Sequence, residues 1–161
     1  MLIRVLYSGA CTIVQCEWNV ESVIMASRKI IRKIIDSPLA PKPVGPYNQA
    51  ILVDRTLYVS GVLGVKRSEG KLVSGGVAAE ARQALINMQY ILEEAGSNFE
   101  KVVKTTILLN NIEDFAAVNE IYKEFFTKNY PARSTFQVGK LPVGAQVEIE
   151  AVAVTDDVEN A

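Results

Sequence analysis

Residues 146–155, QVEIEAVAVT, decide the fold prediction because their side chains alternate between the two faces of an extended strand. One face is apolar throughout, from Val147 onward. The opposite face carries Glu148 and Glu150 and then turns apolar as well. A strand with two apolar faces needs a cover on both sides, and the rest of the chain predicts only two helices. We therefore expect helices on one side of this strand and other subunits on the second side.

The segments before this strand alternate between strand-like and helix-like patterns. Isoleucine-rich or alternating stretches predict strands at residues 28–35, 50–53, 57–63, 102–109 and 133–138. Apolar residues at three- and four-residue spacing predict a helix from about Val77 to a cap at Gly96, and a second helix over residues 113–128. Residues 65–73 form a short hairpin or a loop, and the prolines of residues 37–46 predict an ordered loop. The order β-β-β-α-β-α-β-β indicates an α+β fold, a mixed sheet with two helices on one face.

The length of 161 residues suits a single domain, which we expect to cover residues 27–161. Residues 1–26 are predicted to be an N-terminal extension, disordered or absent from the mature protein. Residues 1–24 lack the uninterrupted apolar region of a secretory signal, and Met25 begins a second candidate start.

The composition restricts the chemistry that this chain can perform. The sequence has no histidine, which removes the commonest general base and the commonest metal ligand. Its two cysteines, Cys11 and Cys16, form neither a convincing zinc site nor a disulfide framework. We therefore expect no metal, and catalysis by arginine, lysine, tyrosine, hydroxyl, carboxylate or backbone groups. The cysteines favour a reducing compartment, so we predict a cytoplasmic protein, with a mitochondrial or nuclear pool as the alternative.

The charge and hydropathy patterns argue against two kinds of partner. Lys+Arg (17) and Asp+Glu (18) nearly cancel, so no strong global field favours nucleic acid or anionic membranes. No apolar run approaches the roughly 20 residues that a membrane-spanning helix needs. We expect no membrane partner and consider nucleic acid a poor candidate.

Arg133, at the start of a predicted strand, has two interpretations. It is either a strand-end charge paired with a surface carboxylate, or a planar fork that binds a carboxylate or phosphate through two hydrogen bonds. Glu148 and Glu150 also have two interpretations. They belong to a solvated strand face, or one of them orients or activates a water molecule.

Four other positions combine a structural and a functional interpretation. Tyr47 follows a Gly-Pro turn, where it packs over the loop or offers a hydroxyl to a ligand. Ser60 and Gly61 interrupt an apolar strand, as a bulge does or a close approach of the backbone to a bound molecule. Asn119 lies beside the apolar face of the second helix, where a capping or buried hydrogen bond is the structural interpretation. None of these signals is specific by itself.

Six segments carry a family resemblance as a set: GPYNQA at 45–50, YVSG at 58–61, VKTT at 103–106, DFAAVNEIYKEFF at 114–126, YPARSTFQV at 130–138 and VEIEAVAV at 147–154. Together they resemble the Rid family, whose members are also described as L-PSP or UK114-type proteins. The resemblance runs from about residue 28 to residue 155, and the first 24 residues have no counterpart in it.

The resemblance implies a subunit similar to the small chorismate mutases, assembled as a homotrimer with active sites in the clefts between neighbours. It also implies an activity, the hydrolysis of 2-imino acids to 2-oxo acids and ammonia. Pyridoxal-phosphate enzymes release these imino acids from serine and threonine. A protonated imine is already a strong electrophile, so this reaction needs neither a metal nor a cofactor.

The resemblance implies catalytic roles for Arg133, Glu148 and Tyr47. Arg133 would bind the substrate carboxylate, and Glu148 would position or activate water. The wider set with substrate-binding roles is Arg133, Tyr47, Ser60, Gly61, Asn119 and Thr135. Many relatives carry cysteine at the position of Thr135, so a thiol-dependent activity would not transfer to this chain. Glu150 is the weaker candidate and is expected to be structural.

Two alternative functions remain open. Relatives are also described as single-strand ribonucleases and translation inhibitors, although a pI of about 5.6 and the absence of histidine give RNA cleavage little support. The other alternative is a non-enzymatic, chaperone-like trimer whose clefts bind metabolites.

Overall fold

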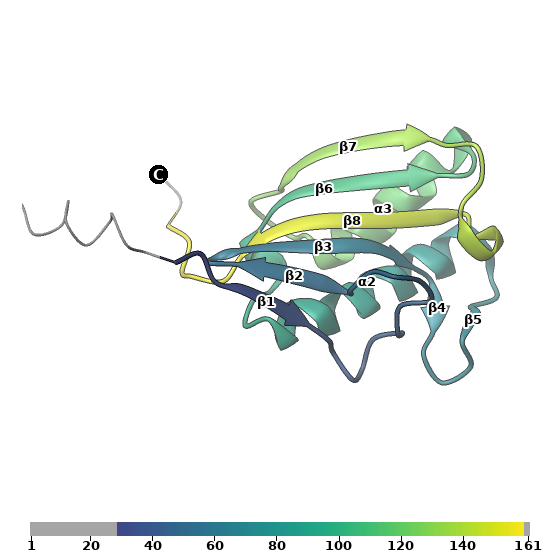
Figure 1. Ribbon diagram of the computed structural model, residues 1–161. Helices are drawn as coiled ribbons and strands as arrows, with labels where there is room; N and C mark the ends of the chain where they lie inside the picture. Colours follow the sequence, from purple (N-terminus) through teal and green to yellow (C-terminus); the bar gives the residue numbers. More distant parts are fainter. Residues whose placement is uncertain (1–28, 160–161) are drawn as a thin grey trace, which may run out of the picture. The chain divides into compact units, whose positions relative to one another are not determined.

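The computed structural model describes residues 29–159, in which the chain forms one α+β unit (Figure 1). The predicted N-terminal extension lies outside the described residues. Among the helices that the structure describes, none is long and apolar enough to cross a membrane.

Six strands form the main sheet in the order β1-β2-β3-β8-β6-β7 (Figure 1). Their bounds are Arg32–Ile35 for β1, Ala50–Val53 for β2, Thr56–Leu63 for β3, Val102–Leu109 for β6, Ala132–Gln137 for β7 and Val147–Val154 for β8. Neighbouring strands are antiparallel except β6 and β7, which run parallel because a helix crosses between them. The stretch that decides the fold is β8, and it lies between β3 and β6.

The predicted strands are confirmed, with one difference in length. The first strand starts at Arg32 rather than at residue 28, because its partner β2 ends at Val53, which pairs with Arg32. Residues 65–73 form the hairpin rather than the loop, with β4 (Val65–Lys66) paired to β5 (Lys71–Leu72).

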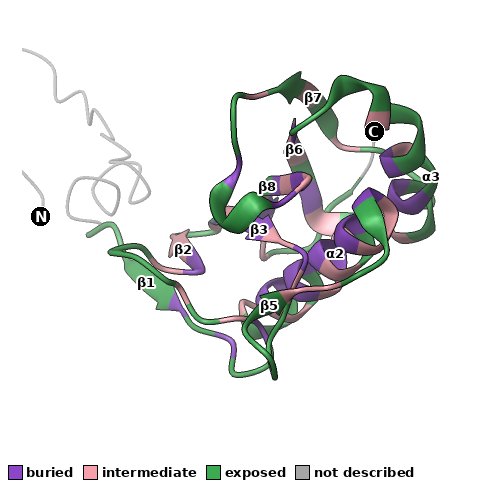
Figure 2. Ribbon diagram, turned by 90° about the vertical axis from the view of Figure 1, so that its right-hand side faces the viewer, coloured by how far each residue is buried: buried purple, intermediate pink, exposed green. Residues whose placement is uncertain are grey.

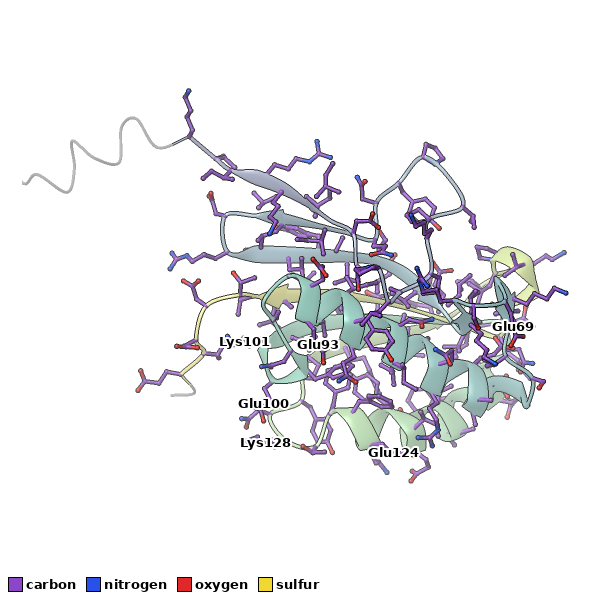
Figure 3. All side chains as sticks on the ribbon, turned by 90° about the horizontal axis from the view of Figure 1, so that it is seen from below. Glu69, Glu93, Glu100, Lys101, Glu124 and Lys128 are labelled. Atoms are coloured by element: carbon purple, nitrogen blue, oxygen red, sulfur yellow. The ribbon has the colours of Figure 1, made fainter. Side chains whose placement is uncertain are left out.

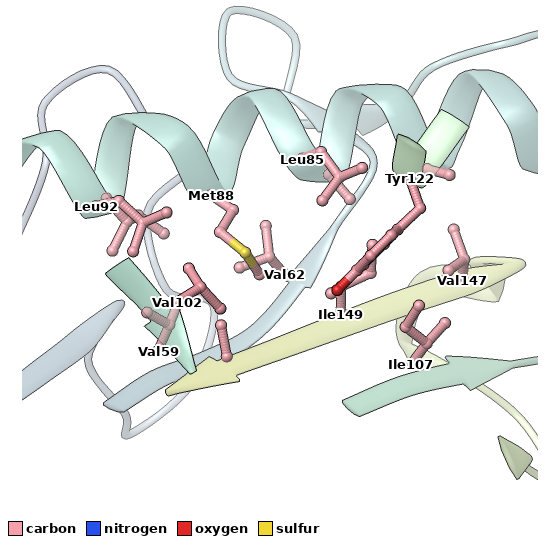
Figure 4. Packing of buried hydrophobic residues seen from close by; sticks show 14 of the residues in the cluster. Val59, Val62, Leu85, Met88, Leu92, Val102, Ile107, Tyr122, Val147 and Ile149 are labelled. Carbon is pink, nitrogen blue, oxygen red and sulfur yellow. The ribbon is translucent and has the colours of Figure 1, made fainter. Parts of the chain in front are cut away.

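Two helices, α2 (Gly76–Glu94) and α3 (Phe115–Phe125), cover one face of the sheet (Figure 1). Leu85, Met88 and Leu92 of α2 turn toward the strands and are fully buried (Figure 4). The colouring by burial shows the same division, with buried segments of both helices and exposed residues along β1 (Figure 2). Full burial of one such apolar side chain contributes roughly 1.5–3 kcal/mol, so this stripe fixes α2 against the sheet.

The end of α2 confirms the predicted glycine cap. Gly96 has a φ of 77°, a left-handed conformation that glycine adopts without steric cost. The amide of Gly96 donates to the Glu93 carbonyl at 3.0 Å, and the amide of Ser97 donates to the Leu92 carbonyl at 2.8 Å. These two bonds form a Schellman motif, which satisfies carbonyls that the helix leaves unpaired.

The second predicted helix, residues 113–128, is too long at both ends. A 3₁₀ turn, η2 (Ile112–Asp114), precedes α3, and the helix ends at Phe125. Phe126 leaves the helix because its buried ring stacks on the ring of Tyr122, with 4.2 Å between the ring centres. Beyond it, Lys128 pairs at 3.0 Å with Glu100 of the 3₁₀ turn η1, Phe99–Lys101 (Figure 3).

The opposite face of the sheet is only partly covered by this chain. One row of side chains in register crosses all six strands: Ile34, Ile51, Tyr58, Val152, Lys104 and Ala132. Ile34 is 56% exposed and Tyr58 52%, and Phe136 of a neighbouring row is 55% exposed. The predicted second apolar face of β8 is therefore present, and the helices of the same chain do not cover it.

Candidate active site

A bulge interrupts β3 at Ser60 and Gly61, where the register with β8 shifts. The amide of Ser60 donates to the Gln49 carbonyl at 3.0 Å, and its hydroxyl donates to the Asn48 carbonyl at 2.7 Å. Bulges re-aim side chains and are common beside active sites. The bulge interpretation of this dipeptide is confirmed, and the two residues also line a cavity.

Gly61 is required by the carboxylate of Glu148, which lies directly over it. A Cβ atom at position 61 would stand 1.6 Å from Oε1 of Glu148. Real Cβ atoms essentially never approach another heavy atom below 3.0 Å, so any larger residue would displace the carboxylate. The sequence pattern Ser-Gly in β3 and the glutamate of β8 are thus one structural feature.

The environment of Glu148 makes its charged form less favourable than that of an exposed glutamate. Its side chain is half-buried, and burial raises the pKa of the carboxyl above its ordinary value. The neighbouring charge of Glu150, two residues on and on the same face of β8, raises the pKa further. A carboxylate with a raised pKa is the kind of group that exchanges protons with water during catalysis.

Tyr47 lies at the end of the proline-rich loop and is held by short-range contacts. Its hydroxyl accepts a hydrogen bond of 3.4 Å from the amide of Val44. The buried side chain of Gln49 ties the loop down, since it accepts from the Ser37 amide at 2.6 Å and donates to the Pro41 carbonyl at 2.9 Å. The loop is therefore ordered, as predicted, and presents a half-exposed tyrosine.

A cavity of about 760 Å³, the acid cavity below, gathers four of the predicted site residues: Tyr47, Ser60, Gly61 and Glu148. Its other walls come from the proline-rich loop, the hairpin of β4 and β5, and the 3₁₀ turn η3 (Pro142–Gly144). A mostly apolar cavity of this size with a few converging polar groups is typical of small-molecule sites.

Arg133 lies in a different place, the cation cavity below, which measures about 380 Å³. Asn119, Lys123 and Tyr130 line the same cavity. The surface ion pair that would explain Arg133 structurally is missing among residues 29–159. Its guanidinium carbon instead lies 4.9 Å from the ring centre of Tyr122.

The two charged groups point to opposite faces of the sheet. Arg133 is in register with Thr105, which is buried beneath the helices. Glu148 alternates with Val147 and Ile149, whose buried side chains face the helices, so its own side chain points away from them. A single copy of the chain therefore does not bring Glu148 and Arg133 together.

Two further predicted residues line neither cavity. Thr135 is half-buried on the helix-covered face of β7, in register with Ile107. Glu150 is exposed and acts on the site through its charge, which fits the weaker role expected for it. The sequence interpretation missed Lys42 and Arg67, which line the acid cavity. No local pattern marks them, because the placement of the proline-rich loop, for Lys42, and of the β4–β5 hairpin, for Arg67, decides where they lie.

The part of the chain from residue 29 to residue 159 holds no cluster of three or more acidic or cysteine side chains that could bind a metal ion.

Comparison with known proteins identifies close relatives. The family described as Endoribonuclease L-PSP matches residues 37–155. A human protein named 2-iminobutanoate/2-iminopropanoate deaminase is 58% identical over 125 residues, which make up 78% of this chain and 91% of the human protein. The RutC family protein UK114 of Drosophila melanogaster is 52% identical over 130 residues, 81% of this chain and 94% of the fly protein. Among solved structures, E. coli TdcF with bound serine is 37% identical, with a TM-score of 0.73 over 76% of this chain and 98% of that one.

Proposed function

The chain belongs to the endoribonuclease L-PSP (Rid) family, and on that premise we propose that it hydrolyses the C=N bond of reactive 2-imino acids. It is an imine deaminase that converts 2-iminobutanoate and 2-iminopropanoate to the 2-oxo acids and ammonia. The observation that carries this conclusion is the 58% identity to the human deaminase over 78% of the chain. Enzymes that eliminate water from hydroxy-amino acids supply such imines.

The reaction needs a placed water and a proton carrier. Water attacks the carbon of the protonated imine, and the Glu148 carboxylate takes a proton from it, which leaves a neutral carbinolamine. Glu148 then returns the proton to the amino group, and the C–N bond breaks with its electron pair on nitrogen. The remaining hydroxyl proton passes to the released ammonia, so the products are the 2-oxo acid and an ammonium ion. The raised pKa of Glu148 suits this two-way transfer, because the ideal pKa lies near the working pH.

Arg133 supplies the site with a binding group for the substrate carboxylate. Its guanidinium carries two parallel donors that match a carboxylate, and no acid of the described residues occupies them. Tyr47, Ser60 and Gly61 shape the acid cavity, and Asn119 lies beside Arg133 in the cation cavity. Thr135 follows on the same strand face, where it supports substrate binding through β7.

We infer that the complete site forms between two copies of the chain in a homotrimer. Two observations support this inference. Glu148 and Arg133 lie in separate cavities, and the open sheet face exposes apolar side chains such as Ile34 and Tyr58. Monomeric proteins rarely leave a large contiguous apolar patch in water. A neighbour that covers the open face would bring its Arg133 to the acid cavity of the first copy.

A coupled assay tests the activity. A threonine dehydratase generates 2-iminobutanoate, and release of the 2-oxo acid is followed with and without this protein. We expect faster release with the wild-type chain and no acceleration with Arg133→Ala, while sedimentation shows an intact trimer for both. Equal rates with and without the wild-type chain would contradict the proposed activity.

RNA cleavage is the alternative function, since the family is described as an endoribonuclease. Transfer of a proton from a ribose 2′-hydroxyl is a task that enzymes commonly give to histidine, and this sequence has none. Incubation of single-stranded RNA with the wild type and with Glu148→Gln separates the functions. Cleavage that survives Glu148→Gln would show an RNA site apart from the imine site, whereas no cleavage leaves the deaminase as the function.

The cytoplasm remains the compartment that we propose, on the strength of the cysteine usage alone. A relative from Arabidopsis thaliana, 42% identical, is named a chloroplastic Reactive Intermediate Deaminase A, so members of this family also work in organelles. Imaging of the full chain with a C-terminal fluorescent tag distinguishes these locations.

A further inference from the structure

Two residues outside the predicted site, Tyr122 and Thr105, are placed to hold the side chain of Arg133. We propose that Tyr122, fixed by Thr105 and helped by Phe115, positions the Arg133 guanidinium for the substrate carboxylate. The inference rests on the proposed function, because it assigns a reason to the orientation of its carboxylate-binding residue. Tyr122 and Thr105 act through Arg133, as positioning residues, and the ring of Tyr122 also forms part of the wall of the cation cavity.

Arg133 needs such support because of where it lies. It belongs to β7, which is the edge strand of the sheet, and its side chain is exposed. A long side chain at a strand edge moves among many rotamers, and the loss of that freedom weakens the binding of a ligand. An ion pair with a carboxylate would order the guanidinium, but it would also occupy the donors that a substrate needs.

Aromatic rings order a guanidinium without occupying its N–H donors. The guanidinium carbon of Arg133 lies 4.9 Å from the ring centre of Tyr122 and 5.6 Å from that of Phe115. Both distances fall within the range of a cation–π interaction, in which the positive group lies over the face of the ring. The edges of the guanidinium, where the N–H groups point, remain available for a carboxylate.

Tyr122 is itself held in one position. Its side chain is 3% exposed, and its hydroxyl shares a hydrogen bond of 2.9 Å with that of Thr105, which is completely buried. Thr105 is the residue of β6 that stands in register with Arg133. On another side, the ring of Phe126 stacks on the Tyr122 ring at 4.2 Å. The tyrosine thus connects α3 to the point of the sheet where Arg133 begins.

The protonation of Tyr122 does not disturb this arrangement near neutral pH. Burial raises the pKa of its phenol, and the hydrogen bond with Thr105 and the charge of Arg133 oppose that rise in part. The phenol therefore stays neutral at the pH of the cell. The interaction should operate unchanged over the whole pH range in which the enzyme works.

Three variants of the full chain test the inference. Tyr122→Leu removes the ring, Tyr122→Phe keeps the ring and removes the hydroxyl, and Phe99→Leu is a control. Phe99 packs edge-on against Phe126, 4.9 Å away, and contacts the same aromatic cluster without lying over Arg133. Each variant is measured for Tm, for kcat and KM in imine hydrolysis, and for the NMR order parameter of the Arg133 Nε–Hε bond.

We expect Tyr122→Leu to raise KM about tenfold with a much smaller change in kcat, because a lost cation–π contact weakens carboxylate binding. The Arg133 order parameter should fall in the same variant. Tyr122→Phe should keep KM within about threefold of the wild type, since the ring remains. Phe99→Leu should lower Tm and leave both KM and the order parameter unchanged.

The NMR measurement keeps this inference separate from the proposed function. If Tyr122→Leu is folded and its KM and order parameter equal those of the wild type, the positioning role is wrong. If the order parameter falls but the wild type hydrolyses no imine, the positioning role stands and the proposed activity is wrong. A fall of the order parameter in Phe99→Leu equal to that in Tyr122→Leu would also overturn the inference, because the whole cluster would then be responsible.

Discussion

The acid cavity and the cation cavity differ in how each holds its charged residue. Glu148 lies in a wall built from backbone irregularities, a bulge and a glycine that leaves room for the carboxylate. Its half-burial disfavours the charged form and raises its pKa. Arg133 lies on an edge strand, exposed, and rests on aromatic rings that leave its N–H donors free.

This difference fits the two tasks that we propose for Glu148 and Arg133. A group that exchanges protons must have its pKa shifted toward the working pH, and partial burial does this. A group that binds an anion must stay charged and keep its donors free, and stacking on rings does that. The sheet separates the two environments, so each can be built without disturbing the other. Under the proposed function, a complete site then requires a second copy of the chain.

Removal of either charged group should have the largest effect, and the two variants should fail in different ways. Glu148→Gln should lower kcat by about 10²- to 10⁴-fold, because proton transfer to water is lost. Arg133→Ala should lower kcat/KM by about 100-fold, mainly through KM, because the carboxylate loses its partner. Steady-state rates of oxo-acid release measure both. If both variants lowered kcat and left KM unchanged, the distinction between a proton-transfer residue and a carboxylate-binding residue would be wrong.

Gly61→Ala tests whether the acid cavity depends on the space that Gly61 leaves for the Glu148 carboxylate. The added methyl group displaces the Glu148 carboxylate, and a displacement of about 1 Å costs about 100-fold in rate. Gly139→Ala is the matched control, since a Cβ at position 139 meets nothing within 4 Å. Rates of imine hydrolysis for the two variants make the comparison.

The free energy of unfolding, measured by chemical denaturation, shows whether the Glu148 carboxylate is the group that the added methyl group of Gly61→Ala displaces. Gly61→Ala should lower the free energy of unfolding less in a Glu148→Ala background, because the conflicting carboxylate is gone. Equal losses in both backgrounds would show that Glu148 is not what Gly61 accommodates.

The pH dependence of kcat/KM should show the raised pKa of Glu148. The rate is expected to fall as pH drops through that pKa, above the ordinary value of about 4.3 for glutamate. Glu150→Gln removes one cause of the rise, so the acidic limb should move to lower pH. Glu93→Gln, an exposed carboxylate of α2, should leave the limb in place. If Glu150→Gln leaves the acidic limb at the same pH, then the limb does not report the pKa of Glu148.

The smallest expected effect is a gain in stability when Glu148 is neutralised. A carboxyl whose pKa is raised in the folded state binds more protons there than in the unfolded chain, so stability falls as pH rises from the unfolded value through the folded one. Glu148→Gln should therefore raise Tm at pH 7, and the difference from the wild type should vanish below about pH 4. Arg133→Ala should show no such pH-dependent gain. A lower Tm for Glu148→Gln at pH 7 would contradict the conclusion that burial and Glu150 disfavour the charged carboxylate.

The fold could be predicted from the sequence because its signals are local and agree with one another. The alternation of β8, the spacing along α2 and the cap at Gly96 each act within a few residues. The end of α3 could not be predicted, since it depends on Phe126 packing against Tyr122 and Phe99. Packing between distant parts of the chain outweighs local helical preference there.

Six of the residues that line the two cavities could be predicted, but their division between the cavities could not. Strand alternation groups Arg133 with Thr135 but does not say which face of the sheet α3 covers. That assignment depends on the parallel register of β6 and β7, which places Arg133 beside Thr105 and over Tyr122. Tyr122 lies within the helix predicted over residues 113–128, and only the fold shows the cation above its ring.

A mixing experiment tests most directly that one site uses Glu148 of one copy and Arg133 of another. Glu148→Gln and Arg133→Ala chains, each nearly inactive alone, are unfolded together in equal amounts and refolded. In a cyclic trimer, random mixing leaves about one quarter of the sites with both intact groups, so about one quarter of the wild-type activity should return. Activity that stays at the level of the separate variants, in trimers shown by mass spectrometry to contain both chains, would contradict a site shared between subunits.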